Sequence, residues 1–162
     1  MGGVSDLHRR DRLRRRLSLT AYVEFKLART RGRAAWFNFF VRPLGAPSFA
    51  DFWRRWNPVY GYFLYYYAYR PLSRVAPRSA AVLLTFVLCG LLLHDVPAWL
   101  AARRVLPPGG IVAFVLFGLG AILSEKLHMD LSRWPVAARA LVNLAYLVAC
   151  VAIMLAIVRG LA

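Results

Sequence analysis

The sequence predicts an all-α integral membrane protein with about three transmembrane helices, preceded by amphipathic and interfacial helices. Three observations support this class. Hydrophobic residues make up 60% of the 162 residues, and the mean hydropathy is +0.50, whereas soluble domains are roughly 45–50% apolar even with glycine included. Long apolar runs fill the second half of the chain. The net charge of +15 lies mostly outside those runs, which favours lipid headgroups over nucleic acid as its partner.

Residues 1–33 form a basic N-terminal region rich in arginine. Apolar residues such as Leu13, Leu17, Tyr22 and Phe25 recur between the arginines at helical spacing. This pattern is typical of an amphipathic helix that lies on a membrane surface. A partly disordered tail is an equally good interpretation of the same composition.

Residues 34–78 form an aromatic segment that is rich in tyrosine and tryptophan. Both side chains favour the membrane–water interface, where an apolar ring and a polar tip are satisfied together. Prolines at positions 43, 47, 58 and 71 interrupt the segment, so we expect two short helices with breaks. Residues 61–69 can dip into the bilayer but are too few to span it.

Residues 79–162 form the predicted transmembrane bundle, with apolar spans at residues 80–102, 111–124 and 136–158. A span needs about 20 residues, each rising about 1.5 Å, so the middle one is short. Sixteen of the 22 Lys and Arg residues precede residue 79, which predicts a cytoplasmic N-terminus. Abundant arginine and alanine with only two lysines favour a bacterial source, and hence a bacterial plasma membrane.

An ionisable residue, His94, interrupts the first span. Such residues in hydrocarbon are costly and mark functional sites, unless they only bond to a neighbouring helix. On a regular helix, Gly90 and Ala98 flank His94 and leave open space beside the imidazole, while Pro97 disturbs the helix next to it. A neutral imidazole can take the proton of an alcohol that attacks a thioester. Asp95 is expected to cap a helix end or face water. A core histidine bonded across a helix pair is an equal alternative.

A second polar element, Trp53-Arg54-Arg55-Trp56-Asn57-Pro58, precedes the spans. The amide of Asn57 can donate a hydrogen bond to a developing oxyanion or hold a substrate, and the two tryptophans can shape the mouth of a cavity. Arg54 and Arg55 suit the phosphates of coenzyme A or lipid headgroups, and the headgroup interpretation is modestly preferred.

This element, the later Tyr69-Arg70-Pro71-Leu72 and the tripeptide Leu93-His94-Asp95 together resemble the signature of the membrane-bound O-acyltransferase family. The resemblance covers about residues 36–125 and implies that Asn57 and His94 are the active-site pair. It also implies acyl transfer, usually from acyl-CoA, to a hydroxyl group. The sequence departs from the family pattern in two ways: aspartate replaces the glutamate that often follows the histidine, and family members usually have many more spans, most of them before the Asn element.

The combined prediction is a membrane-embedded O-acyltransferase-like protein with His94 as general base and Asn57 as polar stabiliser. The substrate-binding residues are expected to be Trp53, Trp56, Arg54, Arg55 and Gly90. Acyl-CoA is the expected co-substrate, with no bound cofactor and no metal, and membrane lipids are the expected surroundings. The alternative is a non-catalytic adaptor or accessory subunit of a larger membrane complex. A homo-oligomer or a larger membrane partner would supply the helices that a short chain lacks.

The remaining polar and small residues of the spans are expected to serve packing. Cys89 and Cys150 are interpreted as small apolar packing residues. Gly118 and Gly120 permit close helix approach. Asn143 is expected to bond to a neighbouring helix. The cluster of Glu125, His128 and Asp130 is expected to be a solvated loop, because a metal requires more ligands.

Overall fold

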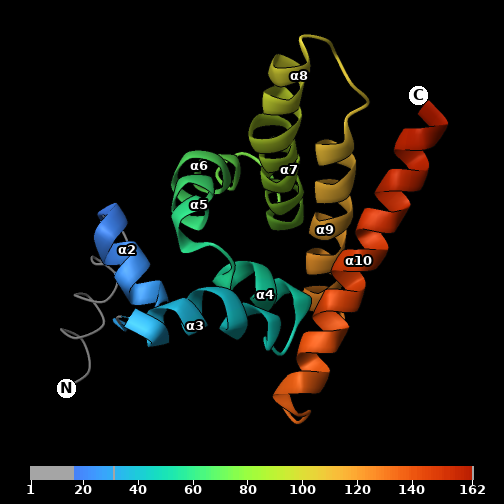
Figure 1. Cartoon of the computed structure of the whole chain (residues 1–162). Coiled ribbons are helices and arrows are strands. Elements are labelled where there is room, and N and C mark those ends of the chain that lie inside the picture. The colour runs from blue at the N-terminus through green and yellow to red at the C-terminus, as the bar shows by residue number, and fades with distance from the viewer. Residues whose placement is uncertain (1–16, 31, 162) are drawn as a thin grey trace.

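The computed structural model describes residues 17–30 and 32–161, within which all regular structure is helical. Figure 1 shows α7, α9 and α10 standing together as a bundle, with the N-terminal helices on one side of it. The elements in chain order are α2 (Leu19–Lys26), α3 (Gly32–Leu44), α4 (Phe49–Arg55), α5 (Pro58–Phe63), the π-helix η1 (Leu64–Tyr69), α6 (Arg70–Leu72), α7 (Arg78–Gly90), the π-helix η2 (Leu91–Asp95), α8 (Val96–Ala102), α9 (Gly109–Lys126) and α10 (Val136–Leu161).

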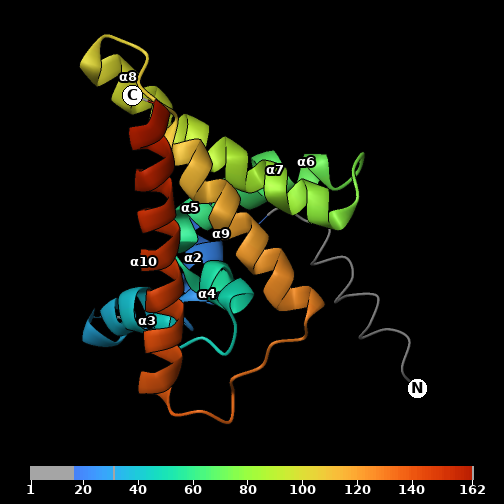
Figure 2. The same cartoon turned by 90° about the vertical axis from the view of Figure 1, so that its right-hand side faces the viewer.

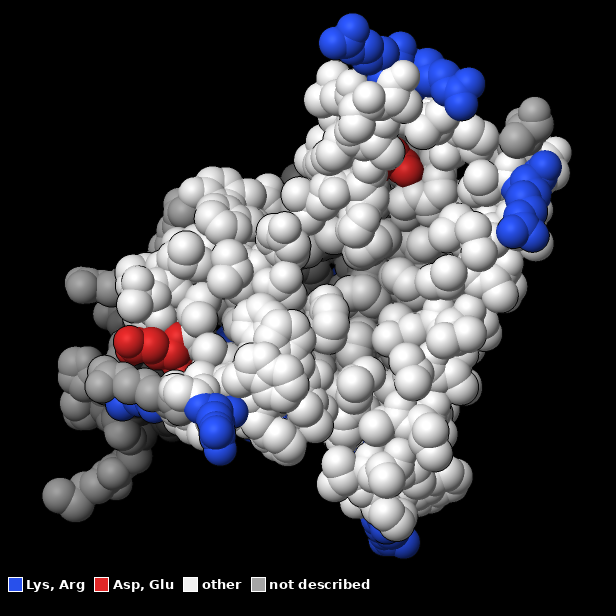
Figure 3. All heavy atoms as spheres, in the orientation of Figure 1, with Lys and Arg blue, Asp and Glu red and all other residues white. Residues whose placement is uncertain are grey.

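Three helices in the described part of the chain are long and apolar enough to cross a membrane: Arg78–Ala102, Gly109–Lys126 and Val136–Gly160. The three predicted spans are therefore confirmed, and the middle one is longer than expected. It continues through Glu125 and Lys126, which are good helix formers. Figure 3 shows Lys and Arg at the ends of this bundle, with a broad face between them that carries almost no charge.

The aromatic segment is more helical than the predicted pair of short helices, since Pro58 and Pro71 lie at helix starts and α3 continues through Pro43. Pro43 lies in the last turn of α3, Pro58 is at the start of α5, and Pro71 is in the first turn of α6. A proline at a helix start has no amide N–H that needs a partner there. Of the basic region, residues 1–16 lie outside the described residues, and α2 forms within the remainder, capped by the hydroxyl of Ser18.

Both π-helices end two residues before a proline. Pro71 follows η1, and Pro97 follows η2. Proline cannot donate to the carbonyl four residues earlier, and the amide N–H groups at the ends of these segments instead reach back five residues, as Val96 does to Leu91. The disturbance expected beside His94 is therefore a π-helix, an irregularity that occurs frequently at functional sites.

Two buried polar side chains fasten the N-terminal half to the spans. The amide of Asn143 on α10 donates to the carbonyls of Leu44 and Ala46, at 2.7 and 3.1 Å, which confirms its predicted role. The hydroxyl of Ser124 on α9 accepts from the amide N–H of Ala50 at 3.1 Å. Figure 2 shows α3 crossing α10 beside this junction. The aromatic core therefore forms between α4 and α9, with Phe49, Phe52 and Phe117 at its centre.

Helix α9 packs closely on both neighbouring spans through glycines. Gly118 lies against Phe86 of α7, where an added Cβ would be 3.1 Å from the Phe86 side chain. Gly120 lies against the ring of Tyr146 on α10, whose hydroxyl donates to the carbonyl of Leu116 at 3.0 Å. The close approach predicted for both glycines is confirmed.

The carboxylate of Asp95 caps the start of α9. Its two oxygens accept from the backbone N–H groups of Gly110 and Ile111, at 2.6 and 2.8 Å, and the residue is 5% exposed. The prediction that Asp95 caps a helix end is therefore confirmed. The cap fixes the first turn of α9 to η2, the segment that carries His94.

Replacement of Asp95 by alanine should lower the free energy of unfolding by about 2 kcal/mol, since two partly buried N–H groups lose a charged acceptor. Chemical unfolding of the protein in detergent measures the change. Asp130→Ala is the control, because Asp130 caps an exposed turn at Ser132 and its loss should have little effect. Equal stability of the Asp95 and Asp130 variants would contradict the role of this cap.

Candidate functional site

His94 lies at the contact between η2 and the first turn of α9. Its ring is 4.8 Å from the ring of Phe114, with the planes tilted by 36°. An added Cβ on Gly110 would be 2.7 Å from the Cβ of His94, so the backbone of α9 fixes the base of the side chain. The side chain itself is exposed, which leaves the imidazole accessible on this face.

The predicted open space beside Gly90 is absent. An added Cβ on Gly90 would be 2.5 Å from the carbonyl oxygen of Gly110 and 2.9 Å from the nitrogen of Ile111. The backbone of α9 fills the position because two glycines allow the helices to touch. The π-helix also changes the register, so the four-residue spacing used to place Gly90 beside His94 does not hold here. Gly90 therefore serves helix packing.

Asn57 begins α5 in a left-handed backbone conformation, with φ 38° and ψ 78°. Its Oδ1 accepts from the amide N–H of Tyr60 at 3.3 Å. Asparagine suits both the left-handed conformation and the capping position, because its short polar side chain tolerates the first and caps helices well. The cap uses the oxygen of the amide and leaves its Nδ2 donor outside that hydrogen bond.

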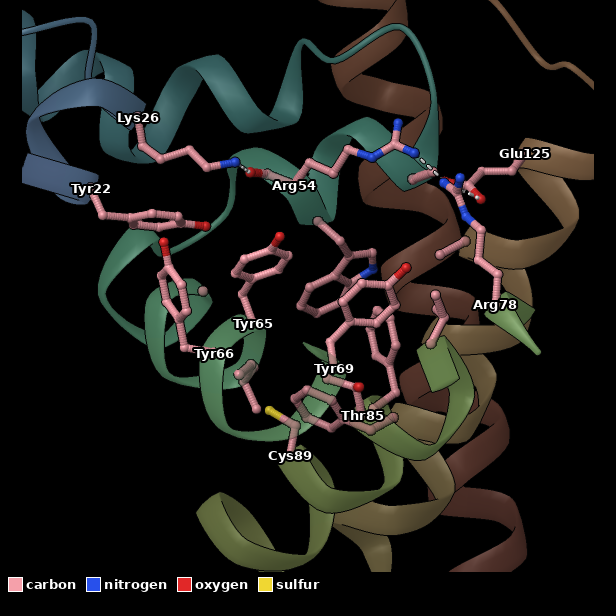
Figure 4. Close-up of a pocket in the computed structure, with 18 of the residues that line it drawn as sticks. Tyr22, Lys26, Arg54, Tyr65, Tyr66, Tyr69, Arg78, Thr85, Cys89 and Glu125 are labelled. Carbon is pink, nitrogen blue, oxygen red and sulfur yellow. Dashed lines mark hydrogen bonds and ion pairs between the residues drawn. The ribbon is translucent and has the colours of Figure 1, made fainter. Parts of the chain in front are cut away.

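A cavity of about 520 Å³ opens between the N-terminal helices and the bundle. Its wall comes from α2, α4, α5 with η1, α7 and α9. Figure 4 shows that the polar groups change in kind from one end of the cavity to the other. Tyrosines lie in the middle, and Thr85 and Cys89 lie at one end. The charged residues at the opposite end are Lys26, Arg54, Arg78 and Glu125. A cavity of this size and mixed lining is typical of a small-molecule site.

The charged end of the cavity is an ion-pair network. Glu125 accepts from Arg54 and, at 3.1 Å, from Arg78, while Arg54 also pairs with Asp51 at 2.8 Å. Exposed pairs of this kind contribute little stability. Three cations and one carboxylate line this end, so the wall carries an excess of positive charge.

The middle of the cavity is a tyrosine layer. Figure 4 shows the hydroxyls of Tyr65, Tyr66 and Tyr69 pointing toward the charged end. Tyr22 of α2 packs edge-on against Tyr66 with ring centroids 6.3 Å apart. Burial, reinforced by Tyr66 and Tyr65, raises the pKa of Tyr22 to about 12, so its hydroxyl stays protonated and able to donate at neutral pH.

The sequence model of the membrane-bound O-acyltransferase family, MBOAT, matches residues 35–158, which is most of the chain. The chain belongs to the membrane-bound O-acyltransferase family. No curated protein and no solved structure gives a significant match. The matched region of this MBOAT protein contains both Asn57 and His94 and all but the last residues of its three spans, and it begins after α2.

The structure brings together only some of the site residues predicted for this MBOAT protein. Trp53 and Arg54 line the cavity, and the indole of Trp53 packs on Phe86, Phe114 and Phe117. Phe114 is the link to His94, because it contacts the imidazole and also lines the cavity. Within the part of the chain that the structure describes, the cavity wall does not include Arg55, Trp56, Asn57, Gly90 or His94.

Several cavity residues escaped sequence-based prediction. The tyrosines at positions 65, 66 and 69 are separated by three and four residues, as on one helix face, and this signal could have indicated a lined surface. Glu125 was expected in a solvated loop, yet it pairs with two arginines from distant segments. The polar residues of the cavity wall that the predicted site omitted are Tyr22, Lys26, Tyr65, Tyr66, Tyr69, Arg78, Thr85, Cys89 and Glu125.

Proposed function

We propose that this protein transfers an acyl group from a thioester donor such as acyl-CoA to a hydroxyl acceptor in the membrane. Family membership over residues 35–158 carries this proposal, because the matched region contains both Asn57 and His94. His94 accepts the proton of the hydroxyl as its oxygen attacks the thioester carbonyl. The new C–O bond forms, the C–S bond breaks, and the proton passes from the imidazole to the departing thiolate.

The local structure supports His94 as the reacting base. Its side chain is exposed while its backbone is held by the π-helix and by the Asp95 cap on α9. A general base must reach the proton of its substrate in the same orientation at every turnover. An accessible side chain on a firmly held backbone meets this requirement. Asn57 is proposed as the donor that stabilises the oxyanion.

We further propose that a second copy or a larger membrane partner completes the reaction chamber. Among the described residues, neither Asn57 nor His94 lines the cavity. Most of α10 is exposed along its length. The second candidate function, a non-catalytic adaptor or accessory subunit, is favoured by the position of His94 outside the cavity. Acyl-transfer measurements separate the two candidates.

The experiment uses the purified full chain in liposomes made from extracted membrane lipids, with labelled palmitoyl-CoA as donor. Label that moves into a lipid product supports the acyltransferase. No transfer by the protein alone, followed by transfer after addition of solubilised membranes from its source, would identify a partner-dependent enzyme. No transfer under either condition favours the adaptor.

Replacement of Asn57 by aspartate should lower kcat about 100-fold and leave the fold intact, since it removes a single oxyanion donor. Aspartate keeps the oxygen that caps α5 at Tyr60 and is as good a helix cap as asparagine. Initial rates and thermal unfolding of the same preparation measure the two effects. A variant that unfolds early but has an unchanged kcat would assign Asn57 to structure alone.

A further inference from the structure

Helix α2 completes the cavity although it lies outside the region matched by the family. The match begins at residue 35, whereas Leu17, just before α2, and Tyr22, Phe25 and Lys26 of α2 line the cavity. This wall therefore lies outside the matched region.

Polar contacts to other cavity-lining elements hold α2 in place. The backbone of Leu17 donates to the hydroxyl of Tyr66 at 3.1 Å and accepts from the hydroxyl of Tyr62 at 3.0 Å. At the other end of α2, the ammonium of Lys26 donates to the carbonyl of Arg54 at 2.9 Å. No described residue of α2 is fully buried, so these contacts at both ends, with the Tyr22 ring, fix the helix over the cavity.

Lys26 differs from the other cations of the charged end. Arg54 and Arg78 both pair with Glu125. Among the described residues, Lys26 makes no ion pair with a carboxylate; its contacts are the Arg54 carbonyl and the ring of Tyr22, 5.5 Å from the ammonium. Burial, and then repulsion from Arg54 and Arg55, lower the pKa of Lys26. An anion at this point would oppose both effects, because a nearby opposite charge favours the charged form of the lysine.

The change from charged to apolar side chains along the cavity favours one class of ligand. The cationic end with Lys26, the layer of tyrosine hydroxyls and the far end with Cys89, in a wall that also includes the apolar side chains of Val82 and Phe114, match an anionic head, a polar linkage and a hydrocarbon chain. Phosphate is an anion that both Lys and Arg side chains bind well.

We infer that α2 is a ligand-recognising wall, and that Lys26 binds the phosphate of an acyl amphiphile whose chain lies against Val82, Cys89 and Phe114. The phosphate can belong to a phospholipid or to an acyl-CoA. The inference concerns binding alone, so it stands or falls separately from acyl transfer.

Photo-crosslinking of the full chain in neutral detergent tests the inference. Three probes carry the same diazirine-labelled acyl chain: phosphatidic acid, acyl-CoA and uncharged diacylglycerol. Peptide mapping should place the phosphate-bearing label on α7 between residues 82 and 89, with diacylglycerol labelling that segment about tenfold less, as loss of a charge-assisted contact predicts. Preference for phosphatidic acid or for acyl-CoA identifies the source of the phosphate.

Variants of the two lysines provide the matched control. Lys26→Gln should reduce labelling by the phosphate-bearing probes about tenfold and leave diacylglycerol labelling unchanged, and Lys26→Arg should restore it. Lys126→Gln, at the exposed end of α9, should behave as the unmodified protein. Labelling that is unaffected in Lys26→Gln, or label located on α10 instead of α7, would overturn the inference. The same labelling in His94→Gln shows that binding persists where turnover fails.

Discussion

Replacement of His94 by glutamine should lower kcat for acyl transfer by about 10²- to 10⁴-fold, the usual contribution of a general base. Glutamine keeps polar atoms at a similar reach but is far too weak a base to take the proton of the attacking hydroxyl. KM for the acyl donor should change little, because the side chain is proposed to act on the proton and not on the donor. Initial rates over a range of palmitoyl-CoA concentrations separate kcat from KM.

Stability provides the internal check on the His94 variant. The side chain is exposed, and its ring contact with Phe114 is modest, so thermal unfolding should shift little. His128→Gln is the matched control, since His128 is an exposed histidine in the turn after α9, and it should keep the full rate. A His94 variant that is as active as the His128 variant would show that another group takes the proton.

Replacement of Gly90 by alanine should lower the free energy of unfolding by about 3 kcal/mol or more, at the upper end of the range for overpacked sites. The added Cβ would be 2.5 Å from the Gly110 carbonyl oxygen. Backbone cannot rotate away as a side chain can, so α7 and α9 must separate. That separation also strains the Asp95 cap on α9 and moves His94, so activity should fall together with stability.

Gly160→Ala is the control for Gly90, because an added Cβ at Gly160 has nothing within 4 Å. Alanine is the better helix former by about 1 kcal/mol, so this variant should be as stable as the unmodified protein or slightly more so. Reversible unfolding in mixed micelles measures both. If Gly90→Ala were as stable as Gly160→Ala, the close α7–α9 contact would be wrong.

The spans were predictable because their signal is local. About twenty apolar residues in a row specify a membrane helix whatever surrounds them, and α10 is the clearest case. The ends were less predictable: Glu125, expected in a loop, lies in α9 and pairs with Arg54 and Arg78, which lie far away in the sequence.

The site was predictable only as a set of residue types. Asn57 and His94 stood out as polar groups in unusual places, but their surroundings depend on packing between distant segments. The space assigned to the side of Gly90 is filled by Gly110, twenty positions later, and helical periodicity within one segment carries no information about that contact. The contact of Lys26 with Arg54 depends on α2 folding back onto α5, and the helical spacing of a basic stretch does not indicate that contact.

The hydrogen bonds from Asn143 to Leu44 and Ala46 have a consequence for how the chain assembles. They join residues 99 and 97 positions apart, and without them the two carbonyls and the amide would be buried unpaired. During synthesis, α3 and α4 emerge long before α10, and segments fold as their partners become available. The docking of the aromatic N-terminal half onto α10 is therefore expected to be a late step of assembly, because α10 is synthesised after the other described helices.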